Sequence, residues 1–335
     1  MRISQVGEFG LINLLNKAMI NSPTGVVAGI GDDAAVLKVS GDQWQLFTTD
    51  MLVEGIHFRL DWASYFDVGW KALAVNISDI AAMGGKPTHG VISLGIPAET
   101  RVEDMEELYL GLRAVARRFG VNLVGGDTVK CPERLVINVA LLGEVAAGKA
   151  ILRSGARPGD IIYTTGTLGT AAAGLHILLN GGNYPDPIKE TVLRAHLRPE
   201  PRVQAGTLLS SLPGVTALDD NSDGLAAELR EIGRASGVGC LIWEKALPVA
   251  AEVQQLAALT GADILDWVMN GGEDFELVFT VQPAYRKQVE AALTKAAVDF
   301  AAIGVITSAR EGLIMERVNG TREAMGQTGY NHFTD

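Results

Sequence analysis

The sequence predicts a two-domain protein of the α/β or α+β class, and three observations support this. The chain has 335 residues, more than a single hydrophobic core usually organises. Hydrophobic residues make up 47% of the chain and charged residues 20%, as in a well-packed globular protein. Short β-rich runs alternate with stretches of helical periodicity, so strands and helices are expected to be interleaved.

The predicted helices come from apolar residues at helical spacing, and the predicted strands from short runs rich in β-branched and aromatic residues. Helices are expected near residues 6–18, 67–83, 102–119, 170–179, 202–212, 223–235, 250–259 and 284–296. Strands are expected at residues 43–49, 89–96, 121–126, 134–145, 160–166, 275–281 and 301–307. The run 29–37 also resembles a buried strand, although the adjacent acids Asp32 and Asp33 interrupt it.

The boundary between the predicted domains lies near residue 148, giving domains at residues 1–148 and 149–335. A long predicted strand ends at residue 145, and a turn rich in glycine, proline and arginine precedes the next strand. Residues 143–150 fit half of a P-loop pattern, but Ala150 stands where a hydroxyl residue would hold Mg²⁺. We therefore expect no P-loop nucleotide site.

Charge and cysteine usage narrow the class of protein. A net charge of −11 disfavours broad binding to nucleic acid or to an anionic membrane, so an anionic partner would need cations to mediate contact. Cys131 and Cys240 are far apart and lack companion ligands, which predicts neither a disulfide framework nor a zinc site. The N-terminal stretch lacks the apolar core of a signal peptide, and no apolar run suffices to cross a bilayer. These features predict a cytoplasmic protein.

Acidic residues form the most informative pattern, because several stand where a predicted strand meets a loop or helix. They are Asp32, Asp33, Asp50, Asp79, Asp127, Asp219, Asp220 and Asp223. Carboxylates beside hydroxyls, without clustered histidine or cysteine, are the ligands of a hard cation. Because Mg²⁺ usually takes one or two carboxylates plus phosphate oxygens, the pattern indicates several Mg²⁺ ions around a polyphosphate.

Structural alternatives exist for these acids. Aspartate is common in turns and at helix N-caps, and Asp223 could cap the helix that follows it. Asp79 differs, because it lies in the almost wholly apolar stretch "ALAVNISDIAAM" and has no basic residue one turn earlier. A functional role is favoured for Asp79.

A series of ordered blocks extends from Gly7 nearly to the C-terminus. They read "GIGDDAAV", "TTDMLVEGIHF", "KALAVNISDIAAMGGKP", "LVGGDTV", "LRSGARPGD", "YTTGTLG", "SDGL", "GGEDFEL" and "GYNHF". With these blocks the chain resembles the thiamine-monophosphate kinases, in the superfamily of aminoimidazole ribonucleotide synthetase and selenophosphate synthetase. The resemblance implies two α/β domains and transfer of the ATP γ-phosphoryl group to thiamine monophosphate. It also implies a homodimer in which the N-terminal domains contribute strands to an interface barrel.

The resemblance carries site residues over by motif. It implies metal ligation by Asp33, Thr48, Thr49, Asp50, Asp79, Asp127, Asp220 and Asp223. It implies ATP contacts by Tyr109, Gly126, Asp127, Arg153 and Ser222, and a substrate pocket with His57, Glu273 and Tyr330. Asp32 is similar to the family's adjacent acid and is expected to support the site. The chain departs from the family's usual pattern at Asn221, where an apolar residue is common before "SDGL", and Asp219 adds an acid.

This chemistry needs no general base, because the second proton of a phosphate monoester has a pKa of about 6 and the nucleophile is already ionised. Arg153 would stabilise phosphate charge, and Tyr330 and Glu273 would complement the thiazolium cation of the acceptor. Other readings stay open at this point. Arg153 could brace the domain junction, His57 could be a core histidine, Glu273 a turn acid and Tyr330 a packing anchor.

Rival functions fit the sequence less well. A selenophosphate synthetase relative is expected to have a reactive cysteine near its N-terminus, but the first cysteine here is Cys131. A hydrogenase-maturation relative is expected to have a C-terminal cysteine, but this chain ends "NHFTD". A catalytically silent nucleotide-binding protein is disfavoured because the set of acids is complete.

Overall fold

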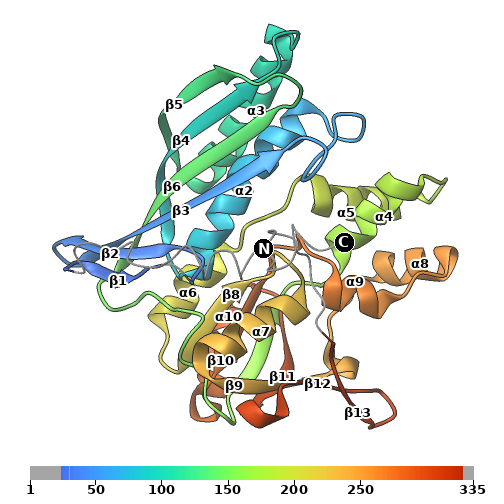
Figure 1. Ribbon diagram of the computed structural model, residues 1–335. Helices are drawn as coiled ribbons and strands as arrows, with labels where there is room; N and C mark the ends of the chain where they lie inside the picture. The colour runs from blue at the N-terminus through green and yellow to red at the C-terminus, as the bar shows by residue number, and fades with distance from the viewer. Residues whose placement is uncertain (1–23, 30, 327–335) are drawn as a thin grey trace, which may run out of the picture.

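The computed structural model describes residues 24–29 and 31–326, arranged as two α/β domains that each contain one mixed sheet (Figure 1). The helix expected at residues 6–18 lies outside the described residues. No helix in the part of the chain that the structure describes is long and apolar enough to cross a membrane.

The N-terminal sheet has the strand order β1-β2-β3-β6-β4-β5. Its strands are β1 (Val26–Ala28), β2 (Ala35–Ser40), β3 (Gln43–Val53), β4 (Lys86–Ile96), β5 (Asn122–Lys130) and β6 (Val136–Ala146). Neighbouring strands are antiparallel except β4 and β5, which are parallel. The helices of this domain are α2 (Tyr65–Ala82) and α3 (Val102–Phe119).

One face of this sheet packs against helices, and within residues 24–29 and 31–326 nothing covers the other face. On β3, Leu46 and Leu52 are buried in the core shared with α2 and α3, whereas Phe47 and Met51, which alternate with them, are 45% and 54% exposed. The same face exposes Val91 on β4 and Val124 on β5. Alternation therefore divides each strand into a helix-covered face and an uncovered apolar face.

Two glycines allow α2 and α3 to pack very closely. A Cβ atom added to Gly69 would lie 2.0 Å from the carbonyl oxygen of Leu108, and one added to Gly111 would lie 2.0 Å from the carbonyl oxygen of Phe66. The helices therefore contact through their backbones at this point, which fixes α2 against the domain.

The C-terminal sheet has the strand order β13-β12-β9-β11-β7-β10-β8. Its strands are β7 (Ile161–Thr165), β8 (Val215–Asp220), β9 (Val238–Trp243), β10 (Leu277–Val281), β11 (Phe300–Ser308), β12 (Leu313–Glu316) and β13 (Arg322–Ala324). The helices are α4 (Thr170–Asn180), α5 (Asp186–Leu197), α6 (Val203–Ser211), α7 (Leu225–Ser236), α8 (Ala251–Thr260), α9 (Ile264–Asn270) and α10 (Arg286–Lys295). Short 3₁₀ turns occupy Glu244–Ala246, Pro283–Tyr285 and Ala309–Glu311.

Helices cover both faces of this second sheet. Ile162 and Val278 point into a core with α7 and α9, whereas the next residues along the same strands, Tyr163 and Phe279, pack against α6 and α10. The rings of Tyr163 and Phe279 are stacked with their centroids 5.2 Å apart. A smaller core joins α4, α5, α8 and α9 at the side of the domain.

The predicted helices and strands within the described residues are confirmed, with ends displaced by a few residues; α3 has the predicted bounds. Helices α5 and α9 and strands β1, β2, β8, β9, β12 and β13 were not predicted. The interpretation of residues 29–37 as one strand is wrong, because β1 ends at Ala28, β2 begins only at Ala35, and Asp32 and Asp33 lie between the two strands.

Candidate active site

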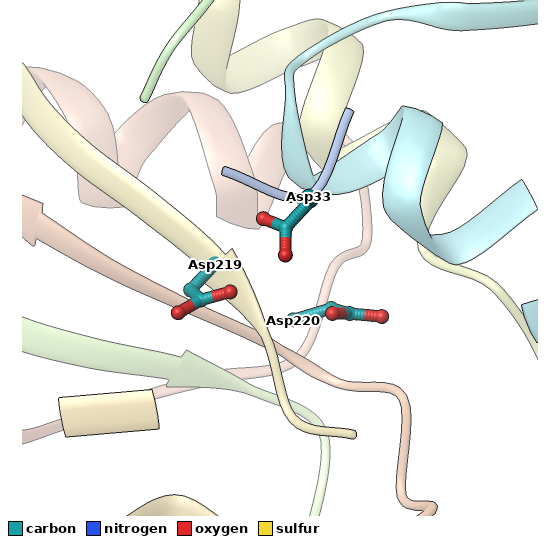
Figure 2. Close-up of side chains that lie close together, drawn as sticks. All are labelled: Asp33, Asp219 and Asp220. Atoms are coloured by element: carbon teal, nitrogen blue, oxygen red, sulfur yellow. The ribbon is translucent and has the colours of Figure 1, made fainter. Parts of the chain in front are cut away.

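Carboxylates from both domains converge where the two sheets meet. Asp33 comes from the bend before β2, and Asp219 and Asp220 end β8 of the C-terminal sheet (Figure 2). Ligand atoms of these three side chains all lie within 4.8 Å of one another, a geometry that suits a metal ion. The convergence explains why two adjacent acids are tolerated at residues 32 and 33: they face a shared polar site between the domains.

Asp50 and Asp79 extend this cluster on the N-terminal side. Asp50 and Thr48 share the helix-covered face of β3, and Asp79 faces them from α2. Thr48 Oγ1 lies 2.5 Å from Asp79 Oδ2 and 3.1 Å from the carbonyl oxygen of Asp33. The expectation that Asp50 stands at the end of a strand is wrong, because β3 continues to Val53.

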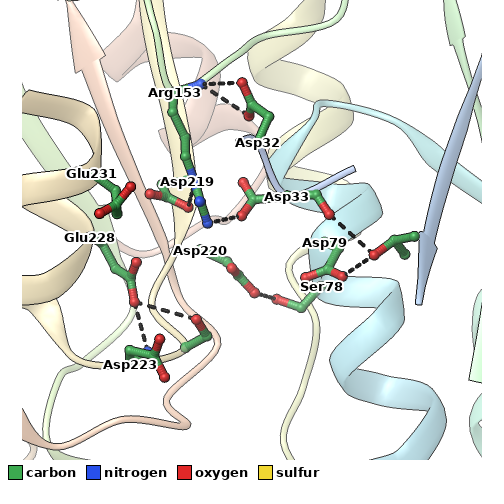
Figure 3. Close-up of polar contacts among 12 residues, drawn as sticks. Asp32, Asp33, Ser78, Asp79, Arg153, Asp219, Asp220, Asp223, Glu228 and Glu231 are labelled. Carbon is green, nitrogen blue, oxygen red and sulfur yellow. Dashed lines mark hydrogen bonds and ion pairs between the residues drawn. The ribbon is translucent and has the colours of Figure 1, made fainter. Parts of the chain in front are cut away.

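Ser78 connects the cluster across the domain boundary. Its hydroxyl, on α2, donates a hydrogen bond to Asp220 Oδ2 at the end of β8 (Figure 3). Ser78 is fully buried, and Asp220 is 1% exposed. The bond therefore ties the first domain's central helix directly to the second domain's acids.

Burial and mutual repulsion favour the protonated forms of these acids. Burial, and then the nearby charge of Asp33, raises the pKa of Asp50 to about 6 and that of Asp220 to about 8. Burial, followed by the charges of Asp50 and Asp220, raises the pKa of Asp79 well above its usual range. Without counter-ions, the site holds more carboxylate charge than it readily stabilises.

A divalent cation fits this site on the chemistry of its donors. Asp33 Oδ2 and Asp219 Oδ2 are buried and have no hydrogen-bond partner among residues 24–29 and 31–326. Buried polar atoms are nearly always paired, so two unpaired carboxylate oxygens within one cluster are suited to bind a ligand of positive charge. An all-oxygen donor set matches Mg²⁺ rather than a softer metal.

Arg153 neutralises part of the cluster. Its Nε donates to Asp219 Oδ1 at 3.0 Å and its Nη2 donates to Asp33 Oδ1, while its backbone N–H reaches Asp32 Oδ1 at 3.2 Å. Burial lowers the pKa of Arg153, but Asp219 and Asp33 outweigh burial and raise it overall. Burial and the charge of Asp33 raise the pKa of Asp32 to about 7. Arg153 thus bridges the domains and faces the site at once.

The segment around Asp223 is held by an acid that sequence reasoning missed. Glu228 Oε1 accepts a hydrogen bond from the backbone N–H of Asp223 at 2.7 Å and from Ser222 Oγ at 3.4 Å. The interpretation of Asp223 as the N-cap of α7 is wrong, because Gly224 occupies that position and α7 has no side-chain cap bond. Asn221 is fully buried, and its Nδ2 lies 3.3 Å from Asp274 Oδ2.

Several residues expected at the site lie elsewhere in this protomer. Asp127 and Gly126 are exposed on β5, and β5, like β3, runs on past its acid, so Asp127 does not end a strand. Thr49 is exposed on the other face of β3, where its hydroxyl donates to the carbonyl of Val139 at 2.9 Å, but it still lines the cavity that adjoins the acids. Tyr109 is half-buried on α3 against the N-terminal core. Tyr330 lies outside the described residues.

A cavity of about 810 Å³ adjoins the acids. Its lining includes Asp50, Asp79, Ser222 and Asp223 and also the residues expected in a substrate pocket, His57 and Glu273. The apolar wall is formed by Ala171, Ala172, Leu175 and Leu179 of α4 together with Ile56 and Trp62. The lining of the cavity therefore combines charged side chains with apolar ones.

His57 and Glu273 are both held at this cavity. His57 is half-buried, and its Nδ1 accepts the backbone N–H of Val53 at 3.0 Å, so it is no core histidine. Glu273 is paired with Lys71 and His196, and its backbone has a positive φ of 70°.

The three acids of the segment 271–276 contact three different parts of the fold. Besides the contacts of Glu273, Asp274 accepts hydrogen bonds from the backbone N–H groups of Gly169 and Ala171 at the start of α4. Glu276 is paired with Arg202 and accepts from Thr165 Oγ1. The segment between α9 and β10 is therefore anchored at three points.

Comparison with known proteins agrees with this architecture. The model of the AIR synthase related protein N-terminal domain matches residues 31–145, and that of the C-terminal domain matches residues 157–316. The thiamine-monophosphate kinase of Bacillus subtilis is 38% identical over 328 residues, covering 97% of this chain and 99% of its own. The chain belongs to the thiamine-monophosphate kinase family.

Solved structures of the kinase family have the same fold as this chain over nearly its whole length. AaThiL complexed with AMPPCP and TMP has a TM-score of 0.87 and 32% identity, and 99% of each chain is covered. The hydrogenase maturation protein HypE in complex with ATP shares the fold alone, with a TM-score of 0.70 at 22% identity over 95% of each chain. The kinase family is thus separated from the rival family by sequence, although both share the architecture.

Proposed function

We propose that the chain phosphorylates thiamine monophosphate with ATP, producing thiamine diphosphate and ADP. Its membership of the thiamine-monophosphate kinase family supports this activity, and AaThiL was solved with an ATP analogue and TMP. The observation that carries the proposal is the convergence of buried, unpaired carboxylate oxygens beside a cavity with apolar side chains in its wall. A nucleotide polyphosphate with its cations suits the first feature, and a heteroaromatic acceptor suits the second.

Asp33, Asp50, Asp79 and Asp220, with Asp223 and Thr48, would hold Mg²⁺ ions in this protomer. The unpaired oxygens and the raised pKa values support this assignment. Two unit charges about 4 Å apart repel by about 4 kcal/mol at an effective dielectric of about 20, and several such pairs arise when two polyanions meet. Bound Mg²⁺ supplies the charge neutralisation that lets the phosphate groups approach.

The protein's own residues orient the reactants. Because the acceptor phosphate oxygen is already ionised near neutral pH, no side chain has to remove a proton. Ion pairs with Asp33 and Asp219 hold the Arg153 side chain in place. Arg153 would therefore present a fixed guanidinium charge to the nucleotide phosphates, and Ser222 would also contact the nucleotide. The γ-phosphoryl group is expected to pass directly in line to the acceptor, without a phosphoenzyme.

The acceptor would pack against the apolar side chains of the cavity wall. Leu175 and Leu179 of α4 offer a surface for an aromatic ring, and His57 and Glu273 offer polar contacts. Tyr330 is proposed as a further contact on the basis of the family resemblance alone.

The remaining proposed ligands favour a homodimer formed through the uncovered face of the N-terminal sheet. Asp127, Gly126 and Thr49 belong to this sheet, and exposed Phe47 and Met51 would be buried by a partner. A second copy packed there would close the two sheets into a barrel and bring its own Asp127 toward this protomer's site. Tyr109 on α3 stays a proposed adenine contact, and the proposed domain join stays near residue 148.

Release of ADP tests the proposed function directly. Purified protein with Mg²⁺ and ATP should release ADP only when thiamine monophosphate is present, and thiamine diphosphate should form in equal amount. Acceptor-independent release would identify a phosphohydrolase instead. Incubation with γ-labelled ATP alone tests the direct transfer, because stable labelling of the protein would contradict it.

A further inference from the structure

The Glu273 carboxylate contacts two nitrogen-bearing side chains that come from different helices. Lys71 Nζ, on α2, lies 2.7 Å from Glu273 Oε1, and His196 Nδ1, on α5, lies 3.1 Å from Glu273 Oε2. Each carboxylate oxygen thus has its own nitrogen partner, and neither helix belongs to the segment that carries Glu273. Lys71 and His196 carry no role in the function proposed above.

The two partners are buried, and the backbone they hold is unusual. Lys71 is 3% exposed and His196 is 6% exposed, so neither is a surface ion-pair partner. Glu273 and Phe275 have positive φ values of 70° and 49°, which are unfavourable for residues with a Cβ atom. Such a conformation persists only where surrounding contacts determine it. The contacts of Lys71 and His196 with the Glu273 carboxylate are of this kind.

The charges of this triad balance. Burial raises the pKa of Glu273, but Lys71 and His196 outweigh it and lower the pKa to about 2. Burial and the charge of Lys71 lower the pKa of His196, so the imidazole is neutral at neutral pH and donates Nδ1–H to the carboxylate. Lys71 therefore already neutralises Glu273, which is a poor counter-ion for a second cation.

Both Glu273 and His196 line the cavity, whereas Lys71 does not. Each carboxylate oxygen offers more than one lone pair, so Glu273 retains acceptor capacity on the cavity side after binding its partners. A neutralised but strongly accepting carboxylate selects an N–H donor rather than a cation.

We propose that Lys71 and His196 are positioning residues that fix the Glu273 carboxylate at the cavity wall, where it accepts a hydrogen bond from an N–H group of the acceptor. The inference rests on the proposed function, since thiamine monophosphate supplies such a donor in the exocyclic amine of its pyrimidine. It replaces the expected pairing of Glu273 with the thiazolium cation.

The variants K71M and H196L test the two contacts with Glu273 separately. K71M keeps an unbranched apolar side chain one atom shorter and without the charge, and H196L replaces the imidazole with an apolar side chain that cannot donate. Each should raise the KM and the dissociation constant for thiamine monophosphate by about tenfold or more, the effect expected on losing a hydrogen bond to a charged group. The KM for ATP should change little. H196N, whose amide nitrogen can replace Nδ1, should restore most of the affinity.

Arg202 provides a matched control. It forms an ion pair with buried Glu276, only three residues from Glu273, with Nε–Oε2 and Nη2–Oε1 distances of 2.7 and 2.5 Å, although the Arg202 side chain is itself 36% exposed. Neither Arg202 nor Glu276 lines the cavity. R202M should therefore lower the melting temperature while leaving the KM for thiamine monophosphate within about twofold of the wild type.

An acceptor analogue identifies the group that Glu273 contacts. Replacing the exocyclic amine with a carbonyl should weaken binding to the wild type by about tenfold and should change binding to E273A far less. Equal losses in the wild type and E273A would overturn the assigned contact.

The outcomes separate this inference from the proposed function. If the wild type shows acceptor-dependent ADP release but K71M and H196L match R202M in acceptor affinity, the positioning role is wrong and the function stands. If the wild type shows no such release, the proposed function fails. The ligand-free crystal structure of K71M, or of H196L if K71M does not fold, then decides the positioning. If the backbone of Glu273 no longer has a positive φ in the variant, the positioning role is supported. If the conformation of Glu273 is unchanged, the positioning role is overturned.

Discussion

Asp50 and Asp127 project from opposite faces of the same six-stranded sheet. The cross-strand register places Asp127 in one row with Ser93, Asn138 and Met51, whereas Asp50 alternates with Met51 along β3. In the order β3-β6-β4-β5 the two strands are three steps apart, or about 14 Å at the usual strand spacing. One protomer alone does not bring these two carboxylates to a single ion.

Mixing two inactive variants therefore tests whether Asp127 serves the partner's site. D50N and D127N should each reduce turnover by about a hundredfold or more if both residues ligate essential metal. In dimers reassembled at random from equal amounts, about a quarter of the sites would hold both native aspartates if Asp127 acts in trans, so activity should return to about that fraction.

The control is the same mixing procedure applied to D50N and D79N. Both residues belong to one protomer's cluster, so no reassembled site contains both native side chains, and activity should stay low. Failure of D50N and D127N to complement, with subunit exchange shown by labelled protomers, would contradict the trans arrangement.

Asp79→Asn should abolish turnover without harming the metal-free fold. Asp79 is half-buried beside Asp33, Asp50 and Asp220, and its pKa is raised well above the usual range by removal from water and by these charges. The neutral amide removes the repulsion, so the melting temperature in EDTA should equal or exceed that of the wild type. Differential scanning fluorimetry checks this, and a loss of more than about 5 °C would indicate that Asp79 chiefly stabilises the fold.

The metal-free protein should become less stable as the pH rises. The pKa of Asp50 is about 6 and that of Asp220 about 8, against an ordinary value of 3.8, so the folded chain binds more protons than the unfolded chain between these values. Their stabilising contribution is present at low pH and is lost as the pH rises through about 6 and about 8. Urea unfolding between about pH 5.5 and about pH 8.5 measures the slope.

Adding Mg²⁺ to the same titration provides the comparison. Binding to the ionised carboxylates stabilises the folded state most at high pH, where metal does not compete with protons, and should flatten the slope. A slope unaffected by Mg²⁺ would count against metal binding at these aspartates.

Removing Arg153 should destabilise the metal-free protein strongly. Its side chain is 14% exposed and is paired with Asp33 and Asp219, which are 2% and 0% exposed. R153M leaves both carboxylates without their cation and should lower the unfolding free energy by about 3–5 kcal/mol. R101M removes an ion pair whose partners are 70% and 67% exposed and should cost at most about 1 kcal/mol in the same assay.

Sequence reasoning reached those parts of the site that local pattern determines. An acid inside an apolar helix marked Asp79, and the structure places it, half-buried, beside three other carboxylates. Ser78 and Glu228 were not predicted as site residues. A serine in a helix and a glutamate on an amphipathic helix are both common, so the local sequence does not distinguish them. Their importance comes from partners that the sequence pattern does not reveal, namely Asp220 and the backbone of Asp223.

The missed elements have a similar cause. Strand β8 ends in the acids "DD" and so reads as a polar loop, although pairing with β10 continues through Asp220. Helix α5 has only three buried residues, Ile188, Val192 and His196, and its weak apolar stripe follows a proline-rich turn. The side of the sheet to which Asp127 belongs depends on a strand order that does not follow the chain order.

The three-point anchoring of residues 271–276 bears on how this protein can evolve. Glu273, Asp274 and Glu276 each meet fixed partners on separate elements, so inserting or deleting one residue would displace at least two contacts together. Most surface connections tolerate changes of length, but this one does not have that freedom. Across homologous kinases, the number of residues joining α9 to β10 should therefore be constant even where the connecting sequence varies.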